Sequence, residues 1–154
     1  MDKVIKLDEK EIVAEKKILT DVQKGVIEKK LGARLAKTEW TFYIAKSDGK
    51  TGGKVDGYAL IDNELGKEEP ITFLTALTPQ GSVKEVEILA YREAYGGEVR
   101  GAKYLKQYRG KKSDDPVRVG QDIVNISGAT ISSRSVALGV KRALSLWSCM
   151  YGAR

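Results

Sequence analysis

Four stretches of the chain place apolar side chains at alternate positions, a pattern that predicts half-buried β-strands. The clearest is 40–45, where Trp40, Phe42 and Ile44 take every second position. The other three stretches cover 55–62, 71–77 and 83–91. Consecutive strands joined by short turns rather than by helices indicate an antiparallel sheet.

The last two of these strands are separated only by Thr78-Pro79-Gln80-Gly81, a turn sequence. They are therefore expected to form an antiparallel hairpin. The alternation after residue 83 is imperfect, which predicts a β-bulge near Lys84 and Glu85. A further turn-rich loop is expected over 47–53, where glycines cluster.

Helical spacing of apolar residues predicts three helices. The first covers 9–31, with Thr20 as its candidate N-cap and Gly32 at its end. A short second helix is expected over 99–108, and a long third helix after Thr130. The third carries one apolar stripe, on which Trp147 is expected to belong to the core rather than to a ligand site.

The order of these elements predicts an α+β fold, with an antiparallel sheet and flanking helices, in a single domain. A length of 154 residues and a mass of 16.9 kDa fit one domain of ordinary size. Within it we distinguish an N-terminal helical segment over 1–35 and a binding domain over 36–154, together forming one compact unit.

Composition removes several kinds of chemistry. The chain has no histidine, which excludes histidine general bases, Ser-His pairs and histidine-bound metal or haem. A lone cysteine, Cys149, excludes an internal disulfide and a thiolate metal cluster. No metal site and no catalytic residue are predicted. Any chemistry must come from a bound cofactor, from carboxylates or from hydroxyl groups.

The net charge of +6 is concentrated in one part of the chain. Residues 98–142 contain ten basic and four acidic side chains, whereas the remainder is balanced at seventeen of each. This excess predicts an anionic ligand or partner. No nucleic-acid-binding motif accompanies it, so nucleic acid is not expected. No apolar run approaches the ~18 residues of a transmembrane helix.

The string Asn125-Ile126-Ser127-Gly128-Ala129-Thr130-Ile131-Ser132-Ser133 stands just before the long helix. A helix N-terminus offers unpaired backbone N–H groups and a partial positive charge. Hydroxyl groups and an arginine in the first turn would favour a phosphate there. A plain serine-rich helix cap is the alternative explanation of the same residues.

The S-G-A-T part of this string resembles the flavin-attachment motif of the FMN-binding domain family. That family includes the C subunit of the sodium-pumping NADH:quinone oxidoreductase and the G subunit of the Rnf electron-transport complex. The resemblance covers roughly 55–147, and it implies FMN joined through a phosphoester to the hydroxyl of Thr130. The neighbouring residues implied to bind FMN are Ser127, Gly128, Ala129, Ile131, Ser132 and Ser133.

Two further segments are similar to the family in the expected order. Residues 92–97 resemble its E-T-P-G segment beside the flavin, and 107–111 resemble its Q-F-x-G-K segment. The residues implied to line the site are Glu93, Ala94, Tyr95, Gly96, Gly97 and Lys111. Two positions depart from the family pattern: Val124 replaces an aspartate, with Asp122 nearby, and Ala94 replaces a threonine.

Individual roles within this set stay open at the level of the sequence. Tyr95, in a glycine-containing loop, is a candidate to stack on the flavin ring. Glu93 could hydrogen-bond the flavin, or it could be an ordinary surface carboxylate. Lys106, Arg109 and Lys111 are candidates to place positive charge near the ring. With Lys112, Lys111 could also steer an acidic redox partner.

The resemblance implies an electron-transfer flavoprotein domain, a component of an oxidoreductase rather than a stand-alone enzyme. It also implies a separate flavin transferase for maturation and a redox partner protein, such as a membrane complex. The implied location is extracytoplasmic, on the periplasmic or cell-surface side, with a leader that this sequence lacks. The alternatives are a flavin-dependent reductase of a small substrate and a non-redox interaction module of the same fold.

Overall fold

The computed structural model describes residues 3–7, 10–47 and 53–152. Its centre is a six-stranded sheet in which each strand pairs antiparallel with the next along the chain. The strands are β1 (Lys3–Leu7), β2 (Lys10–Ile18), β3 (Glu39–Ser47), β4 (Lys54–Leu65), β5 (Pro70–Leu77) and β6 (Val83–Ala90). With its flanking helices, this sheet confirms the predicted α+β fold class.

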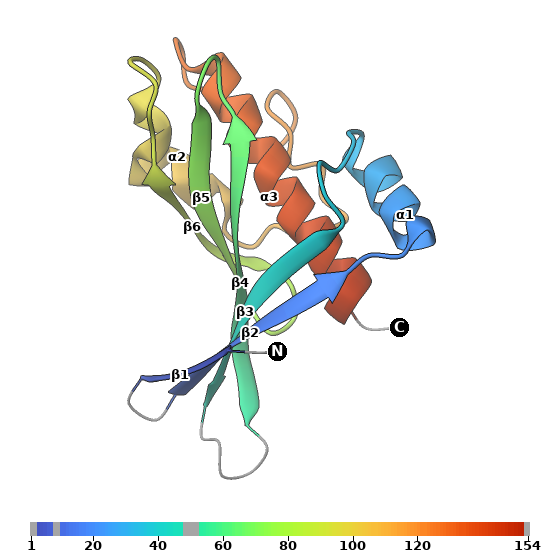
Figure 1. The fold of residues 1–154 in the computed structure, drawn as a ribbon. Coiled ribbons are helices and arrows are strands. Elements are labelled where there is room, and N and C mark those ends of the chain that lie inside the picture. Colours follow the sequence, from blue (N-terminus) through green and yellow to red (C-terminus); the bar gives the residue numbers. More distant parts are fainter. Residues whose placement is uncertain (1–2, 8–9, 48–52, 153–154) are drawn as a thin grey trace.

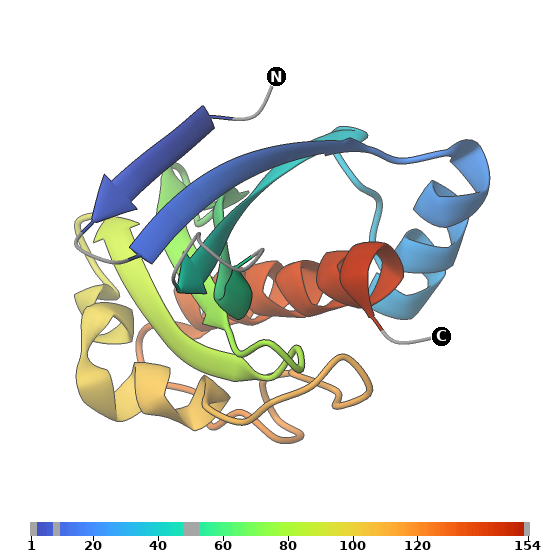
Figure 2. The same cartoon turned by 90° about the horizontal axis from the view of Figure 1, so that it is seen from below.

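The sheet is strongly curved, and the long helix α3 (Thr130–Tyr151) lies along its concave side (Figures 1 and 2). The helix α1 (Asp21–Leu31) packs beside α3. Three short turns of helix follow the last strand and lie next to it. They are η2 (Gly97–Arg100), α2 (Ala102–Leu105) and η3 (Lys106–Tyr108).

The strands predicted from alternation are confirmed. In β3 the side chains of Trp40, Phe42 and Ile44 are buried. The hairpin of β5 and β6 is antiparallel, and its register shifts because Ala76 pairs with Glu85 while Leu77 pairs with Val83. Lys84 is thus the extra residue of the predicted bulge. Most of the loop predicted over 47–53 lies outside the described residues.

The first predicted helix is wrong over its N-terminal half. Residues 10–18 form β2, which pairs with β3 along its whole length, and the helix begins only at Asp21. The stretch is rich in lysine and glutamate, which favour a helix, but it also contains the β-branched residues Ile12, Val13 and Ile18. Pairing with a distant strand overrides the local preference. The division of the chain at residue 35 stays a prediction.

The part of this helix that does form has the expected ends. Thr20 and Gln23 make a reciprocal capping box, and α1 ends at Gly32. Of its predicted apolar stripe, only Ile27 and Leu31 are buried, whereas Val22 and Val26 face solvent. The carboxylate of Glu28 accepts a hydrogen bond from the backbone N–H of Leu35 at 2.8 Å, which holds the chain after the helix.

Helix α3 forms the core with the concave face of the sheet. Val136, Val140 and Leu144 are buried on the predicted stripe, and Trp147 is a core residue in edge contact with Tyr58. At Gly139 a Cβ atom would lie 1.9 Å from the ring of Phe73. The absence of a side chain there lets helix and sheet approach closely. The predicted 99–108 helix is broken into the three short turns.

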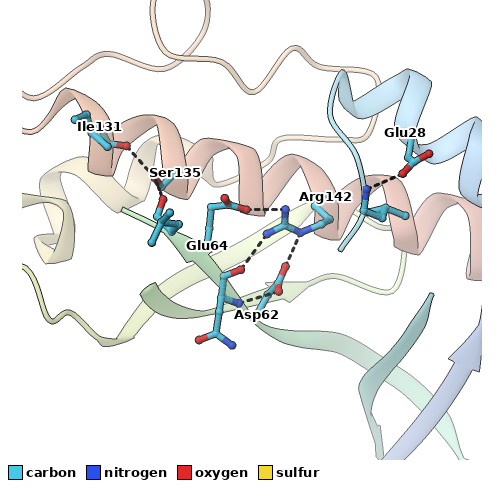
Figure 3. Close-up of polar contacts among 9 residues, drawn as sticks. Glu28, Asp62, Glu64, Ile131, Ser135 and Arg142 are labelled. Carbon is cyan, nitrogen blue, oxygen red and sulfur yellow. Dashed lines mark hydrogen bonds and ion pairs between the residues drawn. The ribbon is translucent and has the colours of Figure 1, made fainter. Parts of the chain in front are cut away.

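A buried ionic cluster joins α3 to β4 (Figure 3). Arg142 donates through Nε to Asp62 at 2.7 Å and through a terminal nitrogen to Glu64 at 2.8 Å. Nearer the start of α3, Ser135 donates to the backbone carbonyl of Leu65 at 2.7 Å. These contacts fix α3 against the end of β4, at Ser135 near its start and at Arg142 past its middle.

Replacing Arg142 by methionine should destabilise the protein strongly, because two carboxylates would remain at a buried site without their counter-charge. We expect the free energy of unfolding to fall by roughly 3–5 kcal/mol. Urea unfolding followed by circular dichroism measures the change. Lys16→Met removes the exposed Lys16–Glu39 pair and is the matched control; its effect should be much smaller, because exposed ion pairs contribute little to stability. Equal losses in both variants would contradict a special role for Arg142.

Candidate functional site

Three segments far apart in the sequence meet at one end of the molecule. They are the β4–β5 turn, the chain that follows β6, and the N-terminus of α3, which gather at the top of Figure 1. Together they enclose a cleft of about 760 Å³. This size lies within the range of ~300–1,000 Å³ typical of small-molecule sites. The cleft therefore brings the S-G-A-T motif next to the segment 92–96.

Thr130 is the first residue of α3 and lines the cleft with Gly128, Ala129, Ile131 and Ser132. The first backbone bond of the helix runs from the N–H of Ser133 to the carbonyl of Ala129 at 2.9 Å. The N–H groups of residues 130–132 precede it and are the orphan donors of the helix end. The first turn has no acidic residue. This edge of the cleft is accordingly suited to an anion.

The Thr130 hydroxyl is oriented by Asn125, whose side-chain amide donates to Thr130 Oγ1 at 2.9 Å. The chain just before Asn125 is held by Gln107. Its amide accepts from the N–H of Val124 at 2.7 Å and donates to the carbonyl of Val124 at 3.2 Å. The sequence does not predict Asn125 as a site residue, since only its place five residues before the threonine hints at such a contact.

A pair of hydroxyl groups joins the chain after β6 to α3 beside the cleft. Tyr91 and Ser132 lie 2.9 Å apart through their side-chain oxygens, and the Tyr91 hydroxyl also donates to the carbonyl of Tyr95. Gly96 adopts φ +84°, and a Cβ atom there would lie 2.5 Å from the Tyr91 hydroxyl. Gly96 is thus needed for the shape of this wall.

Glu93 holds two segments of the cleft together. Its carboxylate accepts hydrogen bonds from the backbone N–H groups of Glu68 at 2.6 Å and of Glu69 at 2.8 Å. These bonds lower the pKa of Glu93 below its usual value. The predicted glutamate therefore lines the cleft, but one of its oxygens is engaged by the β4–β5 turn.

Aromatic and cationic side chains lie at the mouth of the cleft. Tyr95 is 86% exposed and lines the cleft beside Ala94. Lys67 and Arg92 supply positive charge, and Arg92 also donates to the carbonyl of Pro70 at 2.7 Å. Lys67 cannot be singled out from the sequence, because the β4–β5 turn carries no motif. Arg92 opens the predicted segment 92–97, but no role of its own is predicted.

Four predicted site residues do not line the cleft. Ser127 is exposed before it, Ser133 is buried behind it, and Gly97 lies beside Arg100. Lys111 is also absent from the lining, and its side chain pairs with Asp122 at 3.3 Å. Lys106 and Arg109 line a different hollow, beside β6.

Asp122 does not replace the aspartate that Val124 displaces from the family pattern. Its carboxylate accepts from the backbone N–H groups of Val117 at 3.0 Å and Arg118 at 2.9 Å. Hydrogen bonding to these groups and to Lys111 outweighs the effect of burial and lowers the pKa of Asp122. Asp122 therefore stabilises the loop that contains Val117 and Arg118, before the motif.

The described residues show neither a metal centre nor a membrane span. They contain no cluster of three or more acidic, cysteine or histidine side chains placed to hold a metal. Nor does any helix among them combine the length and the apolar character needed to cross a membrane.

Sequence comparison assigns the domain to a class. The sequence model of the FMN-binding domain family matches residues 66–145, a range that contains every lining residue of the cleft. The chain belongs to the FMN-binding domain family.

Two proteins illustrate the relationship. The G subunit of the proton-translocating ferredoxin:NAD(+) oxidoreductase complex of Clostridium ljungdahlii is 31% identical over 100 residues, covering 60% of this chain and 54% of that protein. The crystal structure of Shewanella oneidensis NqrC superposes with a TM-score of 0.52 at 20% identity, covering 72% of this chain and 56% of that one. The chain thus spans about half the length of each relative, and the NqrC likeness supports the fold.

The bonds of Glu93 make the β4–β5 turn sensitive to acid. Because the folded pKa is lowered, the stabilisation is complete above about 4.5, the value of an unperturbed glutamate, and is lost as the pH falls through the folded pKa. NMR titration should show the amides of Glu68 and Glu69 shifting together in that window. In Glu93→Gln this shared titration should vanish. Its persistence would mean that another carboxylate holds the turn.

Proposed function

We propose that this domain is an electron carrier whose FMN lies in the cleft and is attached by a phosphoester to Thr130. The observation that carries the proposal is the position of Thr130, the last residue of the S-G-A-T motif. It opens a helix at the edge of a cleft large enough for a small-molecule ligand. The supporting context is membership of the FMN-binding domain family.

The residues present fit the phosphate end of the cofactor. The N–H groups of residues 130–132 and the partial charge of a 22-residue helix favour a phosphodiester. Gly128 and Ala129 leave room for it at the backbone. No carboxylate hydrogen-bonds Thr130 within the part of the chain that the structure describes. At Thr130 the phosphate would therefore meet N–H donors and no hydrogen-bonded carboxylate, whereas Glu68, Glu69 and Glu93 line other parts of the cleft.

Attachment requires a separate enzyme, the flavin transferase. A threonine hydroxyl is a weak nucleophile unless a base removes its proton, and the chain has no histidine. The one side chain that contacts this hydroxyl in the described residues is Asn125, whose amide donates to it and cannot act as a base. Asn125 instead orients the Thr130 oxygen. The proton of the Thr130 hydroxyl is then free to point away from the amide.

The bound flavin would supply one-electron and two-electron redox chemistry. The protein's part is to hold and shield the ring. Tyr95 is placed at the mouth to stack on it, while Lys67 and Arg92 supply positive charge that favours a reduced, anionic ring. Glu93 keeps the chain after β6 at a fixed distance from the β4–β5 turn.

A carrier explains the cleft better than a reductase of a small substrate. Glu93, the carboxylate of segment 92–96, is engaged by backbone N–H groups, and no base–nucleophile pair is formed around Thr130 among the described residues. The proposed partner is a redox protein, such as a component of a membrane complex, and the proposed location is the extracytoplasmic side. Turnover of a small oxidant without any protein partner would favour the reductase instead.

Covalent attachment should depend on the hydroxyl of residue 130. Co-expression with a flavin transferase is expected to yield a yellow protein that keeps its colour after denaturation, with an intact mass raised by one FMN. Thr130→Ala should lose both properties, because the oxygen of the ester is gone. Thr130→Ser should restore them, and Thr41→Ala, on the far face of the sheet, should change neither. Covalent flavin on Thr130→Ala would refute the assignment.

The place of the ring can be tested through Tyr95. An aromatic side chain stacked on a flavin quenches its fluorescence, so Tyr95→Ser should raise the fluorescence of the flavinylated protein several-fold while covalent attachment stays complete. Tyr43→Ser, an exposed tyrosine on β3, is the control and should leave the fluorescence unchanged. If Tyr95→Ser also leaves it unchanged, the ring does not lie against this segment.

A further inference from the structure

A second hollow lies farther along α3, past the residues of this helix that line the cleft. It has a volume of about 340 Å³ and runs between the end of α1, the loop 117–119 and the middle of α3. Its apolar wall includes Leu31, Val119 and Leu138, and its cations are Arg118, Arg134 and Lys141. We refer to it as the cationic groove. None of its lining residues is shared with the cleft.

The positive charge of the groove is not neutralised. Arg118 and Arg134 are exposed, and neither forms an ion pair with a carboxylate in the described residues. Lys141 is buried and donates to the neutral carbonyls of Ser113 at 2.6 Å and Asp115 at 2.5 Å. Burial lowers the pKa of Lys141, and the positive charges of Lys30 and Arg118 add to this effect more than Asp114 and Asp115 offset it.

The backbone holds Arg118 in place at a cost. Val117 is buried and adopts φ +51°, a conformation that a β-branched residue rarely takes. Residues with such backbone strain cluster at functional sites. Asp122 sustains it by accepting from the N–H groups of Val117 and Arg118. Gly32 leaves space for the Arg118 guanidinium, since a Cβ there would be 3.0 Å from it.

The groove lies beside the cleft because both use the same helix. Arg134 follows Thr130 by four residues, so the two side chains lie on one face of α3, about 6 Å apart along its axis. A molecule seated on Arg134 therefore sits next to the residue proposed to carry FMN. Lys111, by contrast, is paired with Asp122 and is not a free cation for steering.

We propose that the cationic groove docks an acidic segment of the redox partner, whose carboxylates bind Arg118 and Arg134 while an apolar side chain packs on Leu31 and Leu138. The cations of the groove favour an acidic segment through charge complementarity. An inorganic anion would leave the apolar wall without a contact. The partner's redox role rests on the proposed function, but docking itself does not require FMN.

The test uses the protein without flavin and a fluorescein-labelled hexapeptide, acetyl-Glu-Glu-Leu-Glu-Glu-Leu. Fluorescence anisotropy at physiological salt should give saturable binding. The double variant Arg118→Glu, Arg134→Glu should weaken it at least tenfold. The matched control is Lys84→Glu, Lys103→Glu, which makes the same change of net charge at exposed positions outside the groove and should stay within twofold. The neutral Arg134→Gln should cause a smaller loss, and thermal unfolding checks that all variants fold.

Three results would overturn the proposal. Equal losses in the two double variants would mean that only net charge matters. If a peptide with serine in place of leucine binds equally well, the apolar wall plays no part in recognition. Displacement of the peptide by pyrophosphate at a lower concentration than by unlabelled peptide would define a small-anion site. A failure of flavin attachment to Thr130 would leave each of these measurements intact, so the two proposals fail separately.

Discussion

The contact of Arg142 with Asp62 and Glu64 determines where the middle of α3 lies on the sheet. Taking three charges out of water is unfavourable unless their geometry is good, so the cluster tolerates few alternative positions of the helix. Ser135 adds a bond to Leu65, next to the β4–β5 turn. Apolar packing alone would hold α3 against the sheet. The polar contacts of Ser135 and Arg142 specify where the helix lies along the sheet and which face it turns toward it. Both the cleft and the cationic groove inherit their shape from that placement.

The site is assembled by ties between segments that are distant in the chain. Glu93 joins the chain after β6 to the β4–β5 turn, Gln107 holds the residues before the motif, and Tyr91 meets Ser132 on α3. Each tie is made by a side chain to a backbone group or to another hydroxyl. The motif residues themselves contribute small side chains and free N–H groups, so the surrounding residues supply the shape of the cleft and the motif supplies the proposed attachment point.

The sequence predicted features that depend on local pattern. The alternation in β3, the hairpin with its bulge at Lys84 and the start of α3 at Thr130 all follow from neighbouring residues. It failed where pairing is distant: β2 is a strand only because β3 lies beside it, and Lys111 turns to Asp122 across a loop. Lys67 could not be predicted as a lining residue either, because the β4–β5 turn becomes part of the site only in three dimensions.

The missing side chain at Gly139 also limits how α3 can move. With the ring of Phe73 seated against the helix backbone at that point, sliding by one turn would drive a residue with a Cβ into the ring. The sheet therefore holds the helix in a single register. A helix held in this way keeps Thr130 at a fixed position relative to the sheet. In an electron carrier, such rigidity would keep the structural reorganisation that accompanies each transfer small.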